Sequence, residues 1–280
     1  MKIGILYIVT GRYRCFWPLF YSSAMKHFFP GCEKHFYIFS DAEPGFFREH
    51  GENPDHITLI PHERQEWPFT TLLRYRTFLE HSEAWKNNDY TFFINSDYEF
   101  YQDITGSILP TAEENDIVLA EHQKSLDLKP EDYPYERNPE SAAYIPVGQG
   151  SHYVAGGFIG GKTPAFLQLC MELDAATTRD LERDIIAVWH DESQLNAWAL
   201  RHRTRILSPW YIWPSYNITW SNRRKVVAGP RDKLNYGGHE WLRGMTDVKR
   251  KSKRRRRMER CLIIAACVLA ALGAAWYAWS

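Results

Sequence analysis

Cysteine is scarce in this chain, and its few cysteines form no motif. Among 280 residues there are five, at positions 15, 32, 170, 261 and 267, without any Cys-x-x-Cys spacing. Scattered cysteines in an odd number argue against a disulfide framework and against a structural zinc site. We therefore expect the main domain to lie in a reducing environment, as in the cytosol.

The chain also has no formal net charge, but its charges are unevenly distributed along the sequence. Lysine and arginine together number 34, the same as aspartate and glutamate. Residues 249–260 hold nine basic residues and one acidic residue, so the rest of the chain has 25 basic and 33 acidic residues. The main domain is thus acidic, and we expect no nucleic-acid partner for it, although a short basic run can also bind nucleic acid.

The one long apolar run is the last segment. Residues 261–280 carry no charge and directly follow the basic run. A helix of that length spans about 30 Å, which matches a bilayer core, and lysines and arginines stay on the cytoplasmic side of a membrane. We predict a transmembrane tail anchor at 261–280 and a polybasic linker at 246–260. A buried core helix is the alternative for the apolar run.

The start of the chain predicts no signal peptide. Its apolar stretch, residues 3–9, is short and is soon followed by Gly11 and Arg12, which is typical of a buried strand. Together with the tail anchor, this predicts a single-pass membrane protein whose main domain, residues 1–245, stays in the cytoplasm.

Short apolar runs alternate with segments of helical spacing. We predict strands at 3–10, 35–40, 57–60, 90–95 and 117–120, and helices at 16–29, 70–84, 163–172 and 191–201. This alternation is typical of an α/β domain with a mostly parallel sheet, which binds ligands at the carboxyl ends of its strands. The polar stretch 124–150 is predicted to be a long binding loop.

Three short motifs contain candidate functional residues. Asn95-Ser96-Asp97 follows a predicted strand, where a carboxylate and an amide can hold a divalent ion against a diphosphate, although a plain turn has the same composition. Glu192 either attacks a carbon centre or stabilises positive charge on it, or simply belongs to the first turn of a helix. The glycines in 155–161 permit close backbone approach to a ligand, or form bulges.

Together these motifs resemble glycosyltransferase family 6, which contains the ABO blood-group transferases, the α-1,3-galactosyltransferase and bacterial relatives. The similar stretches are FFINSDYEF at 92–100, YERNPESAAYIP at 135–146, YVAGGFIGG at 153–161, WHDESQLN at 189–196 and ILSPWYIW at 206–213. The resemblance implies a GT-A fold, a UDP-sugar donor, and transfer with retention of configuration onto an oligosaccharide acceptor in α-1,3 linkage.

The resemblance also implies roles for individual residues. Glu192 matches the proposed nucleophile of the family. The implied donor-binding residues are Ile8, Val9, Thr10 and Tyr13 at the uridine, Arg74 near the donor, Asn95, Ser96 and Asp97 at the diphosphate, Ala155, Gly156 and Gly157, and the basic Arg231 and Lys233 in a tail that closes over the diphosphate. The implied acceptor-binding residues are His122, Trp189, His190 and Asp191.

The chain departs from the family pattern at positions that bear on metal, donor and acceptor. Asn95 replaces an aspartate, so Asp97 is the main implied metal ligand, and the resemblance leaves open whether Mn²⁺ or no cofactor is required. Trp210 and Pro214 replace acidic residues near the acceptor, which leaves the acceptor open. Gly157 leaves space for an acetamido group and favours UDP-GalNAc. UDP-galactose is the alternative donor, and a non-catalytic glycan-binding membrane protein is the alternative function.

Overall fold

The computed structural model describes residues 1–47 and 54–250. The chain forms two compact units, Met1–Arg231 and Asp232–Ser280. The first unit holds the sheet, the large helices and every predicted site residue except Lys233. In the second unit, the short helices η10 (Lys233–Tyr236) and α7 (His239–Leu242) follow one another.

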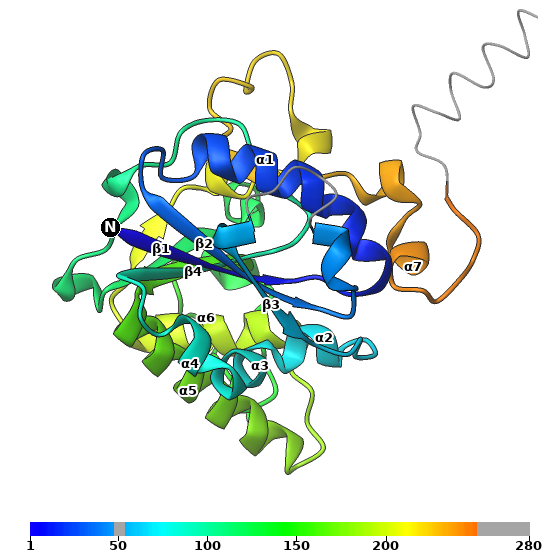
Figure 1. Cartoon of the computed structure of the whole chain (residues 1–280). Coiled ribbons are helices and arrows are strands. Elements are labelled where there is room, and N and C mark those ends of the chain that lie inside the picture. Colours follow the sequence, from blue (N-terminus) through cyan, green and yellow to red (C-terminus); the bar gives the residue numbers. More distant parts are fainter. Residues whose placement is uncertain (48–53, 251–280) are drawn as a thin grey trace, which may run out of the picture. The chain divides into compact units, whose positions relative to one another are not determined.

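A seven-stranded sheet forms the centre of the first unit (Figure 1). Its strands are β1 (Lys2–Ile8), β2 (Glu33–Ser40), β3 (Ile57–Pro61), β4 (Tyr90–Ile94), β6 (Ile117–Glu121), β7 (Val154–Lys162) and β8 (Arg205–Leu207). They lie in the order β3-β2-β1-β4-β7-β6-β8, and only β7 runs antiparallel to its neighbours. The predicted α/β fold with a mostly parallel sheet is therefore confirmed, and it fits a GT-A-like architecture.

Helices cover both faces of this sheet. In Figure 1, α1 (Trp17–His27) lies on one face, and α3 (Arg74–Glu80), α5 (Thr163–Leu181) and α6 (Asp191–Arg201) lie on the other. Each face is closed by aromatic packing, with Trp17 and Phe20 on the α1 side and Phe78 and Phe166 on the other side. The apolar faces of these helices are thus the faces that pack against the sheet.

The predicted helix at 70–84 is broken into α2 (Phe69–Leu72), α3 and α4 (Ser82–Trp85), with nonhelical dihedral angles at Leu73 and His81 between them. The remaining short helices are of the 3-10 type: η1 (Gly11–Phe16), η2 (Pro44–Phe47), η3 (Pro54–His56), η4 (Gly106–Ile108), η5 (Ala112–Glu114), η6 (Gln123–Leu126), η7 (Pro130–Asp132), η8 (Pro209–Tyr211) and η9 (Ser215–Asn217). A small antiparallel ribbon of β5 (Tyr98–Phe100) and β9 (Ala228–Pro230), which the sequence did not predict, completes the unit.

Strand β7 carries a bulge at its glycines. Leu119 of β6 pairs with Ile159, but the next residue, Ala120, pairs with Ala155, so Gly156, Gly157 and Phe158 have no partner on β6. Extra residues of this kind bend a strand and release its backbone groups for other contacts. We call residues 156–158 the β7 bulge.

The membrane prediction is not supported and is corrected here. The apolar segment 261–280 and most of the basic run lie outside the described residues. Across 1–47 and 54–250, no helix combines the length and the apolar character that a bilayer span requires. The longest, α5, has 19 residues but includes Glu172, Asp174, Arg179 and Asp180. The predicted fold class is therefore reduced to its α/β part, and the anchor and the cytoplasmic localisation derived from it are dropped.

Candidate active site

The end of β1 carries the residues predicted to hold a uridine. Beyond Ile8 the chain leaves the sheet, although Val9 still donates a backbone hydrogen bond to Phe39 of β2 at 2.9 Å. The Gly11 amide then donates to both carboxylate oxygens of Asp41 at 2.9 Å, with a φ of +56° that favours glycine. Tyr13 donates its amide to Thr10 at 3.2 Å. These contacts fix the turn at the carboxyl ends of β1 and β2.

The Asn95–Asp97 corner follows β4 and is fixed through its main chain. The backbone N–H of Asn95 donates to the carbonyl of Gly157 at 3.0 Å. The Tyr7 hydroxyl donates to the Ser96 carbonyl at 3.0 Å, and the Arg231 amide donates to the Asp97 carbonyl at 2.7 Å. The corner therefore joins β1, the β7 bulge and the end of β9.

Asp97 is the carboxylate of this corner, and it is only 3% exposed. Within the part of the chain that the structure describes, no three His, Cys, Asp or Glu side chains are grouped so as to hold a metal. A divalent ion at Asp97 would therefore need further oxygen ligands, and a diphosphate offers such oxygens. The side-chain amide of Asn95 is neutral and binds a divalent ion less well than a carboxylate does.

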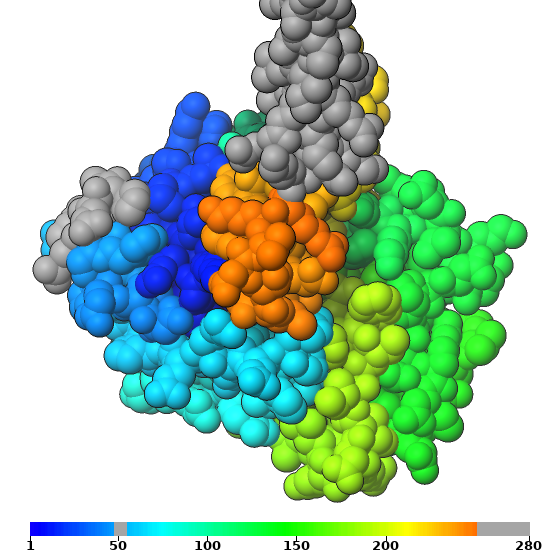
Figure 2. Space-filling model, turned by 90° about the vertical axis from the view of Figure 1, so that its right-hand side faces the viewer, coloured from blue at the N-terminus to red at the C-terminus, as the bar shows by residue number. Residues whose placement is uncertain are grey.

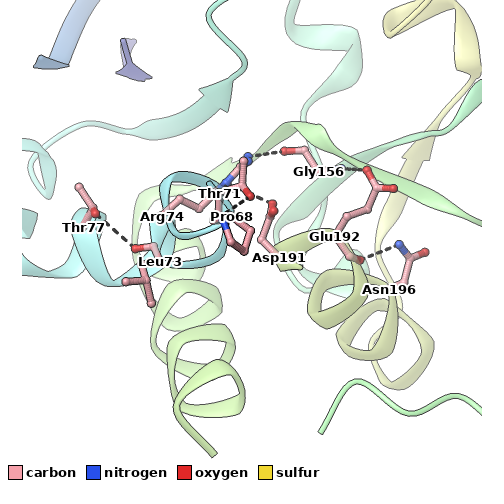
Figure 3. A network of polar contacts seen from close by, with 9 residues as sticks. All are labelled: Pro68, Thr71, Leu73, Arg74, Thr77, Gly156, Asp191, Glu192 and Asn196. Carbon is pink, nitrogen blue, oxygen red and sulfur yellow. Dashed lines mark hydrogen bonds and ion pairs between the residues drawn. The ribbon is translucent and has the colours of Figure 1, made fainter. Parts of the chain in front are cut away.

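Arg74 links the β7 bulge to the start of α6 (Figure 3). Its Nη1 donates to the Gly156 carbonyl at 2.8 Å, its Nε lies 3.1 Å from Oδ2 of Asp191, and its guanidinium stacks 4.5 Å from the centre of the Phe93 ring. The same Nε donates to the Thr71 carbonyl at 3.2 Å. Arg74 is only 5% exposed, so its described contacts organise the protein around the site.

Asp191 is a buried carboxyl group with unusual electrostatics. Burial raises its pKa to about 7 and the neighbouring Glu192 carboxylate adds to the rise, while the Arg74 guanidinium opposes it. Among the described residues no group donates a hydrogen bond to its Oδ2: the Arg74 Nε lies 3.1 Å away, but its N–H is directed at the Thr71 carbonyl. Asp191 therefore keeps one unsatisfied oxygen beside Gly156, whose added Cβ would lie 2.8 Å from it.

Glu192 is held in a defined orientation in the first turn of α6. Its Oε1 accepts a hydrogen bond from the Tyr153 hydroxyl at 2.6 Å, and its Oε2 accepts one from the Gly156 amide at 2.8 Å. The N-cap of α6 is His190, without a side-chain cap. Helix capping thus does not account for Glu192, whose side chain turns to the β7 bulge (Figure 3).

The side chain of Asn196 fixes the helix that carries Glu192. Its Nδ2 donates to the carbonyls of Val154 and Glu192, both at 2.8 Å, and its Oδ1 accepts from the Val154 amide at 2.9 Å. The buried start of β7 and the first turn of α6 are thereby joined by three hydrogen bonds from one side chain.

His122 lies on the other side of Tyr153. Its amide donates to the Tyr153 carbonyl at 2.7 Å, and the two rings are 5.6 Å apart. Its Nδ1 accepts from the Lys124 amide at 3.0 Å, so the proton of the neutral ring lies on Nε2. Burial lowers the pKa of His122, although the Glu192 carboxylate partly opposes this. His122 therefore presents an N–H donor near the carboxylate.

Trp189 and His190 lie on the surface next to this centre. Trp189 is 44% exposed, and the Lys124 ammonium lies 5.0 Å from its ring centre. The His190 ring meets the ring of Trp67 at 4.9 Å. Figure 2 shows the same adjacency, with the cyan segment before α2 beside the yellow-green segment before α6.

These contacts connect part of the predicted set. Glu192, Asp191, Arg74 and Gly156 are connected by the contacts above, and Gly157 joins them to Asn95. The Arg231 main chain contacts the corner at Asp97, while its guanidinium pairs with Glu99 at 2.6 Å. Lys233 belongs to the second unit.

Neither Tyr153 nor Asn196 had a predicted role. Tyr153 opens the glycine-rich stretch and Asn196 closes WHDESQLN, but no spacing rule connects residues about forty positions apart. Only the packing of β7 against α6 shows that both contact Glu192: Tyr153 donates to its carboxylate and Asn196 to its carbonyl.

Comparison with known proteins agrees with this geometry. The family model described as Glycosyltransferase family 6 matches residues 1–238. The chain is 33% identical over 239 residues to the O-antigen biosynthesis glycosyltransferase WbnI of Escherichia coli, covering 85% of this chain and 99% of that protein. It is 28% identical over 236 residues to the histo-blood group ABO system transferase 1 of Rattus norvegicus, covering 82% and 67%.

A third relative is the globoside alpha-1,3-N-acetylgalactosaminyltransferase 1 of Gallus gallus, which is 30% identical over 221 residues, or 76% of this chain and 62% of that protein. The family match spans the whole first unit, including the Glu192 centre and the Asn95–Asp97 corner. The chain is therefore a hexosyltransferase that belongs to glycosyltransferase family 6.

Proposed function

We propose that this enzyme transfers N-acetylgalactosamine from UDP-GalNAc, with retention, in α-1,3 linkage to a galactose-terminated glycan. The observation that carries the proposal is the orientation of Glu192. Its carboxylate accepts hydrogen bonds from Tyr153 and from the β7 bulge, and the bulge also holds the Asn95–Asp97 corner through Gly157. A sugar placed against the bulge would have Glu192 on one side and its diphosphate towards the corner.

Two routes with this geometry give retention. In one, a Glu192 oxygen forms a bond to the anomeric carbon while the bond to UDP breaks, and the acceptor hydroxyl then displaces Glu192. In the other, the carboxylate stabilises an oxocarbenium ion as UDP leaves, and the acceptor attacks from the side that UDP left. In both, the acceptor proton passes to an oxygen of the departed diphosphate. The Nε2–H of His122 would orient the acceptor oxygen.

The proposed mechanism is tested by replacing the carboxylate. We expect Glu192→Ala and Glu192→Gln to lower kcat at least about 1,000-fold, a loss typical of a residue that acts on the reacting centre, while UDP still binds with unchanged affinity by calorimetry. Full activity of either variant contradicts the mechanism. If the wild-type protein binds UDP-sugars but releases no UDP with or without an acceptor, the proposed transfer is contradicted and the alternative of a non-catalytic protein is favoured.

The donor preference rests on the space beside Gly157. A Cβ at this position would lie 2.9 Å from Nδ2 of Asn95 and 2.9 Å from the Tyr98 hydroxyl. A methyl group there would therefore displace polar groups of the corner as well as crowd an acetamido substituent. In a competition assay we expect wild type to use UDP-GalNAc over UDP-galactose, and Gly157→Ala to lose more activity with UDP-GalNAc. A wild-type preference for UDP-galactose would reverse the donor assignment.

The same assay tests whether the enzyme needs a metal ion and which acceptor it uses. Fucosylated and unfucosylated galactosides are tested with Mn²⁺ and with a chelator. Asp97→Asn is compared with wild type under both conditions, because it removes the carboxylate of the corner. If Asp97 holds a metal, the variant loses any stimulation by Mn²⁺ that wild type shows.

A further inference from the structure

The hydroxyl of Tyr153 approaches Glu192 more closely than any other described hydrogen-bond donor. The distance to Oε1 is 2.6 Å, which is typical of a hydrogen bond to an ionised oxygen. Tyr153 is 1% exposed. Water therefore has little access to compete for this bond, and the hydroxyl has no other acceptor among its described contacts.

Tyr153 also holds the acceptor side of the centre. Its carbonyl accepts from the His122 amide at 2.7 Å, and its ring packs on the His122 ring. One residue thus contacts both the carboxylate proposed to act on the donor and the histidine proposed to orient the acceptor. Its ring is fixed by the rings of Tyr133 and Tyr135, with centres 6.0 and 5.7 Å away.

We propose that Tyr153 is a positioning residue, whose hydroxyl fixes the Glu192 carboxylate in the orientation that faces the reacting carbon. This inference rests on the function proposed above. A carboxylate held only by the Gly156 amide would rotate about its terminal torsion, which has broad minima. With donors on both oxygens, one rotamer remains. Such preorganisation affects the transition state more than the binding of the donor.

The test compares two tyrosines of the same cluster. Tyr153→Phe removes the hydroxyl that contacts Glu192. Tyr135→Phe removes a hydroxyl that donates to the His152 carbonyl at 2.7 Å, and Tyr135 is also buried, at 5% exposure. We expect Tyr153→Phe to lower kcat by about 10- to 100-fold, as for loss of one hydrogen bond to a charged group. KM for the donor should change less than about threefold, and Tyr135→Phe should retain kcat.

A double variant shows whether the effect passes through Glu192. Adding Tyr153→Phe to Glu192→Gln should lower the remaining rate of UDP release by less than about twofold, because the group that Tyr153 positions is already altered. Additive losses would overturn the inference, as would a wild-type kcat in Tyr153→Phe, a loss confined to KM, or equal losses in both tyrosine variants. If Glu192→Ala itself stays active, the proposed function fails, and not only this inference.

A spectroscopic readout covers the case in which Tyr153→Phe does not fold. 3-Fluorotyrosine is placed at position 153 or 135 of the full chain, and its fluorine resonance is recorded with and without Glu192→Gln. The resonance at 153 should move, and that at 135 should not. An unmoved resonance at 153 would overturn the inference.

Discussion

Replacing Asp191 by asparagine should change how the stability of the protein depends on pH. The folded-state pKa of Asp191 is raised to about 7 by burial, whereas an unfolded aspartate has a pKa of about 3.9. Between these values the folded state keeps a proton that the unfolded state has lost. The contribution of Asp191 to stability therefore falls as pH rises through this window, and the full charge penalty is present only above pH 7.

The magnitude follows from the width of the window. Each pH unit between the two pKa values changes the free energy of unfolding by about 1.36 kcal/mol. The interval from pH 5 to pH 7 covers about two such units. Solvent screens this carboxyl group little, because its side chain is only 5% exposed. Between pH 5 and pH 8 the free energy of unfolding of the wild type should thus fall by about 3 kcal/mol relative to that of Asp191→Asn. For a domain of this size, that corresponds to about 5–10 °C in Tm.

The assay is denaturant unfolding of both proteins at pH 5, 6, 7 and 8. Asp191→Asn also lowers the free energy of unfolding by an amount that does not depend on pH, because Arg74 loses its charge partner. This amount cancels when the stability is compared between two pH values. Asp174→Asn is the matched control, because it removes a carboxylate of the same charge that is 23% exposed and paired with Arg76 at 3.1 Å. If the difference between wild type and Asp191→Asn stays flat from pH 5 to pH 8, the electrostatic account of Asp191 is wrong.

Two further predictions concern the packing that supports the site. Asn196→Ala removes three buried hydrogen bonds and should lower the free energy of unfolding by about 2–4 kcal/mol, together with kcat; an unchanged kcat in the folded variant would contradict its role in holding α6. Gly160→Ala places a Cβ against the ring of Phe92 and should destabilise the protein by about 1–3 kcal/mol. Gly45→Ala is its control, because a Cβ at Gly45 meets no described atom within 4 Å. Similar melting curves for the two glycine variants would refute the packing argument.

Five strands of the main sheet and the starts of its large helices were predictable because their patterns are locally consistent. Strand β7 (Val154–Lys162) was not predicted, because its glycines interrupt the apolar pattern, and α5 continues past its predicted end at 172 to Leu181. The helix at Asp191–Arg201 has its predicted bounds, and β1, β2 and β4 lie within two residues of theirs. The failures have physical reasons. Three-residue strands such as β5, β8 and β9 contain too few residues to show a period, and their pairing depends on tertiary contacts.

The candidate site was predictable where a family motif covers it and unpredictable where contacts cross the chain. Glu192 and Asp191 were chosen from a local motif, and the structure places both beside Gly156. The bond from Tyr153 depends on how β7 packs against α6, which no local pattern encodes. The resemblance implied that Arg231 lies over the diphosphate, and that role stays a prediction; the bond of its guanidinium to Glu99, two residues after Asp97, could not be predicted from the sequence.

The β7 bulge fixes its neighbours through the peptide groups of Gly156 and Gly157. The Gly156 amide and carbonyl bind Glu192 and Arg74, and the Gly157 carbonyl binds the Asn95 amide. Every residue has a carbonyl, and every residue except proline has an N–H, so these bonds are independent of side-chain identity. The donor to Glu192 is the main-chain amide of Gly156, so a change of side chain at the neighbouring position 157 does not remove that donor.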